Sequence, residues 1–226
     1  MESAGDPADG AFQQRYLKSP RACYGLKTKQ RIEMYKVAFP DWRKLERARA
    51  LGFFNELWAG RSWDERIAAL WVLTSIERQL TPDDLPFLLG IARACEGWAD
   101  TDNFSHEILG KMALRLGELI YPDIRAWSND DVLWARRAAI IVHNIPARNA
   151  RLAHKYAWPT WEERLHEKDF FIRKAIGWAL REACKHYPEM ACDFLARVGD
   201  RASALTRREG SRNLPDELKA KLTSTG

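Results

Sequence analysis

Trp98 and Asp102 are a pair of side chains whose types and spacing suit chemistry. They are four residues apart in WADTD, so in a helix they lie on one face, one turn apart. An indole face attracts cations, and a carboxylate stabilises a developing positive charge. The pair therefore suits a planar, cationic ligand. As alternatives, Asp102 is an ordinary acid of a first helical turn, a role that Asp100 fits at least as well, and Trp98 is a core residue.

Two arginines interrupt a second predicted helix, LWARRAAI, which is otherwise apolar nearly all round. Unpaired arginine is rarely buried. We therefore expect Arg136 or Arg137 to reach a concave surface or to meet an anion, such as a phosphate. The alternative is an ion pair with an acidic residue of a neighbouring helix.

A third predicted helix, FFIRKAIGWALRE, carries a tryptophan away from its apolar stripe. The residues of that stripe are Ile172, Ile176, Ala179 and Ala183. Trp178 lies about 200° round the helix from Ile176, with Lys174 and Arg181 one turn before and after it. This pattern predicts an exposed, cation-flanked ring that binds a partner, and its alternative is packing against the next repeat.

Helical patterns also fill most of the chain between these segments, and alternating strand patterns are nearly absent. Capping boxes are predicted where Ser62 precedes Glu65 and where Thr160 precedes Glu163, and Asp169 is a predicted helix cap. Three segments share an arginine before a small, apolar run: ERIAALWVL, ARRAAIIV and IRKAIGWAL. The last two lie about 37 residues apart, which is typical of paired-helix repeats.

These patterns predict an all-α fold, a superhelical stack of HEAT-like repeats that forms a curved solenoid with a concave face. We expect a flexible N-terminus over residues 1–11, one repeat domain over residues 12–213 and a flexible tail over residues 214–226.

The composition favours an anionic partner without proving one. The chain has 226 residues, a net charge of +5 and a pI of about 9.1. The N-terminal segment MESAGDPADG does not predict a signal peptide, and no apolar run approaches the roughly 20 residues of a membrane span. We therefore expect a cytoplasmic, nucleoid-associated protein.

The cysteines and histidines predict neither a disulfide framework nor a metal site. The four cysteines, which have no C-x-x-C spacing, are expected to be reduced and mostly buried: Cys23, Cys95, Cys184 and Cys192. His106-Glu107 begins an H-E-x-x-H pattern, but Gly110 stands where the second histidine would be. We expect no metal and no cofactor.

Taken together, the sequence is similar to the DNA alkylation repair family of AlkD-like glycosylases. The similarity covers roughly residues 15–214, and the matching segments follow the family order with near-family spacing. These segments are YLKSPRACYGLKTKQR, NELWAG, WADTD, LWARRAAI, FFIRKAIGWALRE and LTRRE. The resemblance implies HEAT-like repeats whose concave face holds duplex DNA, and excision of 3- and 7-alkylated purines.

The resemblance also implies roles for particular residues. Asp102 matches the family's catalytic aspartate, Trp98 and Trp178 its two lesion-side tryptophans, and Arg137 the arginine near the backbone at the lesion. Gly97 is a departure, because the family often has a second tryptophan there. We expect further DNA contacts from basic residues, namely Arg136, Arg137, Lys174, Arg181, Arg207 and Arg208.

The leading hypothesis is a monofunctional, monomeric glycosylase of base excision repair that acts on duplex DNA containing alkylated purines. A purine alkylated on a ring nitrogen is already cationic, so it leaves without a general acid, and one carboxylate is enough. The alternatives are an inert helical-repeat protein that binds distorted DNA and a scaffold that binds an acidic protein.

Overall fold

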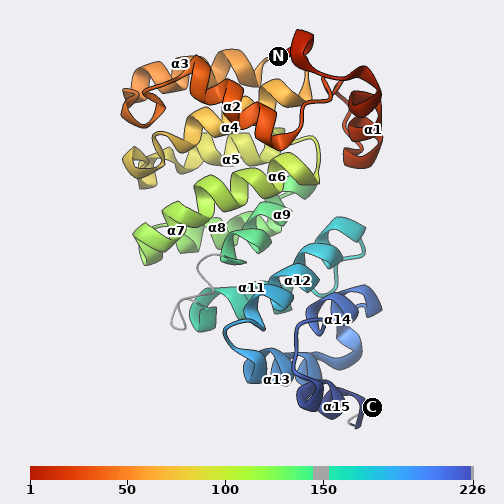
Figure 1. Cartoon of the computed structure of the whole chain (residues 1–226). Helices are drawn as coiled ribbons and strands as arrows, with labels where there is room; N and C mark the ends of the chain where they lie inside the picture. Colours follow the sequence, from red (N-terminus) through yellow and green to blue (C-terminus); the bar gives the residue numbers. More distant parts are fainter. Residues whose placement is uncertain (145–152, 225–226) are drawn as a thin grey trace. The chain divides into compact units, whose positions relative to one another are not determined.

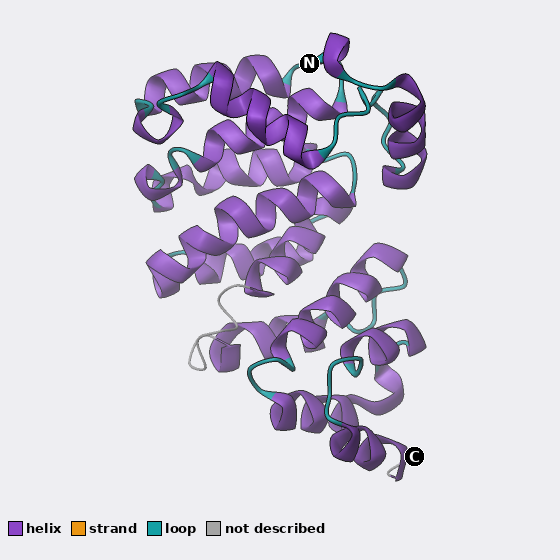
Figure 2. Cartoon of the chain, in the orientation of Figure 1, coloured by secondary structure: helices purple, strands orange, loops and turns teal. Residues whose placement is uncertain are grey.

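The computed structural model describes residues 1–144 and 153–224 of the chain. Across these residues the regular structure is helical, and extended backbone pairs only in one isolated bridge between Ala22 and Ser62 (Figure 2). This confirms the predicted all-α fold. The chain forms two compact units, Met1–Ile108 and Leu109–Gly226, whereas the sequence analysis expects one domain over residues 12–213. The domain boundaries stay a prediction.

The first unit arranges its helices in layers (Figure 1). Its α-helices are α1 Pro7–Leu17, α2 Thr28–Ala38, α3 Arg47–Trp58, α4 Trp63–Thr74, α5 Leu85–Ala94 and α6 Trp98–Phe104. α4 packs against both α3 and α6. The fully buried side chains of this unit include Phe54, Leu70 and Leu88, which come from three different helices. Burial of such apolar faces holds paired helices of repeat proteins together.

The start of α4 follows from its sequence. The Ser62 hydroxyl accepts a hydrogen bond from the Glu65 amide at 3.1 Å, and the Glu65 carboxylate accepts one from the Ser62 amide at 2.8 Å. This confirms the predicted capping box, which satisfies two amides that have no partner inside the helix. α4 then buries every residue from Ile67 to Leu73 except Trp71, which is half-buried.

The second unit contains the remaining α-helices of the described residues, and α12 is at its centre. They are α7 Gly110–Leu116, α8 Tyr121–Ala126, α9 Leu133–Ile141, α11 Trp158–Glu163, α12 Phe170–Ala183, α13 Pro188–Val198, α14 Ala204–Gly210 and α15 Asp216–Ser224. α12 packs against α9, α13 and α14, and α13 packs against α15. The buried cluster of this unit includes Ile140, Trp161 and Leu195.

α12 forms as its sequence predicts. Asp169 caps it by accepting a hydrogen bond from the Phe171 amide at 2.7 Å. The predicted apolar stripe is buried: Ile172, Ile176, Ala179 and Ala183. Gly177 allows α14 to approach closely, because a Cβ at this position would lie 2.6 Å from the Cβ of Glu209. A side chain at position 177 would therefore force the two helices apart.

Some local predictions differ from the structure. The predicted capping box at Thr160 is wrong, because Thr160 lies inside α11 and its hydroxyl donates to the Tyr156 carbonyl at 2.7 Å. A π-helix over Ala153–Ala157 leads directly into α11, so the helical backbone begins before Thr160. Helix also extends into both ends that we expected to be flexible, since α1 begins at Pro7 and α15 begins at Asp216.

The cysteines agree with the sequence analysis. All four are free thiols; Cys95, Cys184 and Cys192 are buried, and Cys23 is half-buried. None of the described helices combines the length and the apolar character needed to cross a membrane.

Candidate functional site

α6 begins without a side-chain cap at its N-terminus. Gly97, the residue before it, is fully extended with φ −166° and ψ 176°. Asp100 in the first turn reaches back instead, and its carboxylate accepts a hydrogen bond from the Glu96 amide at 2.8 Å. Asp100 is 2% exposed. The sequence allowed Asp100 or Asp102 to be the acid that stabilises the first turn, and in the structure Asp100 has this role.

A group of four charged side chains, two of them buried and two half-buried, anchors this helix start. This group, which we call the α6 anchor, consists of Arg21, Arg66, Glu96 and Asp100. Arg21 donates two hydrogen bonds to the Glu96 carboxylate, at 2.7 and 2.8 Å. Arg66 lies 3.8 Å from the Asp100 carboxylate and 3.7 Å from that of Glu96.

Arg66 is the centre of the α6 anchor and is 4% exposed. Its guanidinium lies 3.6 Å from the centre of the Trp58 ring and donates to the Ala94 carbonyl at 2.5 Å. Burial lowers the pKa of Arg66 and raises the pKa of Asp100. Burying a charge is costly unless it is paired, so these partners are needed to keep both groups in place.

Trp98 and Asp102 lie one turn apart on α6, as the spacing predicts, and both are half-buried. Asp102 is about 200° round the helix from the buried Asp100. The Trp98 ring meets the Tyr16 ring of α1 edge-on, with centroids 5.7 Å apart and planes at 86°. Trp98 is therefore held by an aromatic contact between α1 and α6, and Tyr16 is a neighbour that the sequence analysis missed.

The helix changes its geometry just after Asp102. Residues Ser105–Leu109 form a π-helix directly after α6. The hydroxyls of Thr101 and Ser105 donate to the carbonyls four residues earlier, each at 2.7 Å. Such hydroxyl bonds bend helices, and single π-helical turns occur frequently at functional sites. The segment around Asp102 thus has an irregular helix in addition to the contact between Trp98 and Tyr16.

The Trp178 ring is not exposed as the sequence predicts. It is half-buried and packs against the apolar cluster of the second unit. Its two flanking cations are held by one acid of α14, since Lys174 lies 2.7 Å and Arg181 lies 2.9 Å from the Glu209 carboxylate. Close packing at Gly177 brings α14 near enough for Glu209 to bind both cations, and we call these two ion pairs the α14 clasp. DNA contacts from Lys174 and Arg181 stay a prediction.

Arg136 and Arg137 also have partners inside the protein. Arg137 is 3% exposed and donates to the Phe171 carbonyl at 2.6 Å. Arg136 forms an ion pair with Glu167 at 2.9 Å and donates to the Asp130 carbonyl at 2.8 Å. The alternative of an internal ion pair therefore describes Arg136, and Arg137 has a main-chain carbonyl among its partners. A phosphate contact by Arg137 stays a prediction, and it now requires this side chain to turn outward.

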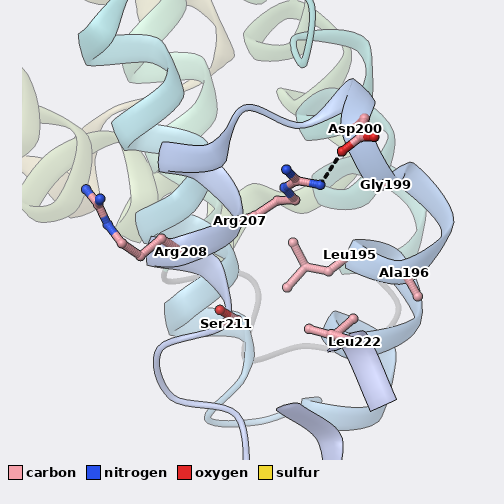
Figure 3. A pocket seen from close by; sticks show the side chains of 8 residues that line it. All are labelled: Leu195, Ala196, Gly199, Asp200, Arg207, Arg208, Ser211 and Leu222. Atoms are coloured by element: carbon pink, nitrogen blue, oxygen red, sulfur yellow. Dashed lines mark hydrogen bonds and ion pairs between the residues drawn. The ribbon is translucent and has the colours of Figure 1, made fainter. Parts of the chain in front are cut away.

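Arg207 and Arg208 are exposed on α14, beside a cavity of about 380 Å³ (Figure 3). Arg207 points toward Asp200 and forms an ion pair with it at 2.5 Å, whereas Arg208 extends away from Asp200. The cavity wall also has an apolar part, formed by Leu195 and Leu222. Contacts of the two arginines with DNA stay a prediction.

One arginine of each repeated segment has a role that the sequence analysis did not assign. Arg66, Arg137 and Arg173 each donate to a main-chain carbonyl, at 2.5, 2.6 and 2.9 Å respectively. The signal was present in the sequence, because each arginine precedes a small, apolar run. An arginine at these positions can therefore bind the main chain of a neighbouring segment.

Comparisons with known proteins agree with this architecture. The model of a family described as DNA alkylation repair enzyme matches residues 1–214. A solved structure described as a predicted DNA alkylation repair enzyme from Enterococcus faecalis is similar, with a TM-score of 0.81 and 19% identity, covering 93% of this chain and 96% of that one. AlkD2 from Streptococcus mutans is also similar, with a TM-score of 0.65 and 15% identity, covering 81% and 89%. No curated protein matches the chain.

Proposed function

The chain belongs to the family of DNA alkylation repair enzymes, and from this premise we propose that it is a monofunctional DNA glycosylase. Its proposed reaction is hydrolysis of the glycosidic bond of cationic alkylated purines, 3-alkyladenine and 7-alkylguanine, in duplex DNA. This would be the first step of base excision repair. The proposal assigns Asp102 as the catalytic residue.

The division of labour between the two acids of α6 is the observation that carries this proposal. Asp100 is buried, caps the helix start and joins the α6 anchor. Asp102 is half-buried, on the far side of the helix from Asp100 and one turn from a half-buried indole. An acid is thus present beside an aromatic ring although the helix start already has its stabilising carboxylate.

One carboxylate suits this substrate class. An alkylated purine already carries positive charge, so it departs as a neutral base without protonation. The sugar becomes positive in the transition state, and a nearby carboxylate stabilises it and activates the attacking water. An uncharged base would need a second acid to protonate it. We therefore propose that excision is confined to cationic lesions.

The proposed roles of the other residues follow from their chemistry. Trp98 and Trp178 would offer indole faces to the positive sugar and base, a contact of up to about 2 kcal/mol when water is excluded. Basic side chains would hold phosphates without reading the base sequence. This set comprises Arg136, Arg137, Lys174, Arg181, Arg207 and Arg208.

Release of 7-methylguanine from duplex DNA tests the proposal. We expect Asp102→Asn to lose about 100-fold or more of the single-turnover rate while it binds DNA about as well as wild type. Asp83→Asn is the matched control, because Asp83 is an exposed acid of the same unit, and it should keep the full rate. Equal rates for wild type and Asp102→Asn would remove Asp102 from the mechanism. An inactive wild type that still binds DNA would favour an inert DNA-binding protein.

A further inference from the structure

Two large rings of α1 are open to solvent. Phe12 is 61% exposed and Tyr16 is 64% exposed. The rings are nearly parallel, with an interplanar angle of 7° and centroids 6.2 Å apart. Single exposed apolar residues are common, but adjacent exposed rings on one helix face mark an interaction site. The packing of the first unit leaves most of the Phe12 side chain exposed.

These rings continue into the candidate site. Tyr16 meets Trp98 edge-on at 5.7 Å, and Trp98 lies one turn from Asp102 on α6. Phe12, Tyr16 and Trp98 thus form a row, which we call the aromatic row, leading from the outside of α1 to the helix with the proposed catalytic acid. In Figure 1, α1 lies at the same end of the first unit as the start of α6.

α1 is held firmly enough to position its rings. The Asp6 carboxylate caps the helix by accepting from the amides of Ala8 and Asp9, at 2.8 and 3.0 Å. Gln13 donates from its side chain to the Leu26 carbonyl at 3.1 Å. Gly10 packs against the segment after α1, since a Cβ there would lie 2.3 Å from the Cys23 carbonyl oxygen. The helix that carries Phe12 and Tyr16 is therefore held in place before any partner binds, which lowers the cost of binding.

The charges beside the row favour a nucleic acid as the partner. Arg15, next to Tyr16, and Lys18, at the end of α1, are both exposed. Rings that pack on sugars and bases, together with cations that meet phosphates, are the usual combination along a nucleic-acid strand. DNA is the partner that we infer, because the same rings lead to the helix that carries the proposed catalytic acid.

We propose that the aromatic row is a contact surface for DNA, with Phe12 as its outermost ring. The deoxyribose rings of the strand beside the damaged nucleotide pack on Phe12 and Tyr16, while Arg15 contacts the phosphates. This inference rests on the proposed function, because it extends the same site. It adds a positioning surface on α1 that holds the strand so that the damaged nucleotide faces Asp102.

Binding to an uncleavable duplex tests the inference without requiring catalysis. The probe is duplex DNA with one tetrahydrofuran abasic analogue, and the dissociation constant is measured by fluorescence anisotropy. We expect Phe12→Ala to weaken binding about 10-fold and Phe12→Trp to restore it. Val37→Ala is the control, because Val37 is 83% exposed on another helix of the same unit, and it should bind like wild type. Thermal melting of each variant checks that α1 remains folded.

The outcomes separate this inference from the proposed function. If Phe12→Ala binds the duplex as tightly as wild type, the aromatic row is not a DNA contact. A loss of affinity that Phe12→Trp does not restore also overturns the inference, because a ring contact accepts a larger ring. If Asp102→Asn excises 7-methylguanine like wild type while Phe12→Ala weakens duplex binding, the proposed function fails and the contact surface stands.

Discussion

The two helices that carry the candidate tryptophans treat charge in opposite ways. At α6, an acid is buried: Asp100 enters the α6 anchor beside Arg66. At α12, the cations are the groups that are bound, because Glu209 of α14 clasps Lys174 and Arg181. The comparison teaches that a charged residue in a motif indicates function only after its internal partners are known. In α6, Asp100 is the acid that stabilises the helix start, and Asp102 lies on the other side of the helix.

Of the charged groups compared at α6 and α12, Arg66 should cause the largest loss of stability when it is removed. Arg66→Met leaves the Asp100 carboxylate buried beside Glu96 with no buried cation between them. We expect the free energy of unfolding to fall by about 3 kcal/mol, as for other broken buried ion pairs. Urea unfolding measures this loss, and Arg78→Met is the control, because Arg78 is an exposed arginine of the same unit. A loss below about 1 kcal/mol would mean that the α6 anchor contributes little.

A buried polar group of the second unit allows a test by pH. His143 is buried and stacks on Tyr121, and neither ring nitrogen has a hydrogen-bond partner among the described residues. Burial lowers the pKa of His143 from 6.5 to about 3. Between these values the unfolded chain binds one proton more than the folded chain. The stabilisation is therefore complete above about pH 6.5 and is lost as the pH falls toward 3, by about 1.4 kcal/mol per unit.

Urea unfolding between pH 4 and pH 8 measures this dependence. The control is His143→Phe, which keeps a ring against Tyr121 and removes the titrating group. Its stability should vary less with pH over the same range. Equal slopes for the two proteins would assign the acid sensitivity to other groups.

The smallest effect on stability is expected from a change in the α14 clasp, at Glu209. The hydrogen bond from Lys174 keeps the pKa of Glu209 below its usual range. Glu209→Gln should cost about 1 kcal/mol of stability, because the two cations are partly exposed. Release of Lys174 and Arg181 should also tighten duplex binding and steepen its dependence on salt, by up to about two phosphate contacts. An unchanged salt slope would show that these cations lie away from the DNA.

The fold could be predicted from the sequence because its signals are local. The capping box at Ser62, the cap at Asp169 and the buried stripe of α12 depend on residues within one or two turns. Thr160 has the same local pattern and failed, because the helix had already begun before it. Local patterns thus predicted helices better than they predicted where helices begin.

The candidate site could be predicted only in part, because its partners are distant in sequence. The spacing of Trp98 and Asp102 correctly placed both on α6. It could not show that Arg66, more than thirty residues earlier, binds Asp100. Nor could it show that Glu209 holds both cations beside Trp178. Exposure is a property of the packed molecule, so the exposed ring predicted at Trp178 was wrong.

The bonds from arginine to main-chain carbonyls have a consequence for how this architecture tolerates change. Arg66 and Arg137 bind the backbone at Ala94 and Phe171, and every residue type has that carbonyl. The side chains at the receiving positions can therefore be exchanged without loss of the joint between helices. Joints of this kind therefore place few demands on the side chains of the segments that they connect.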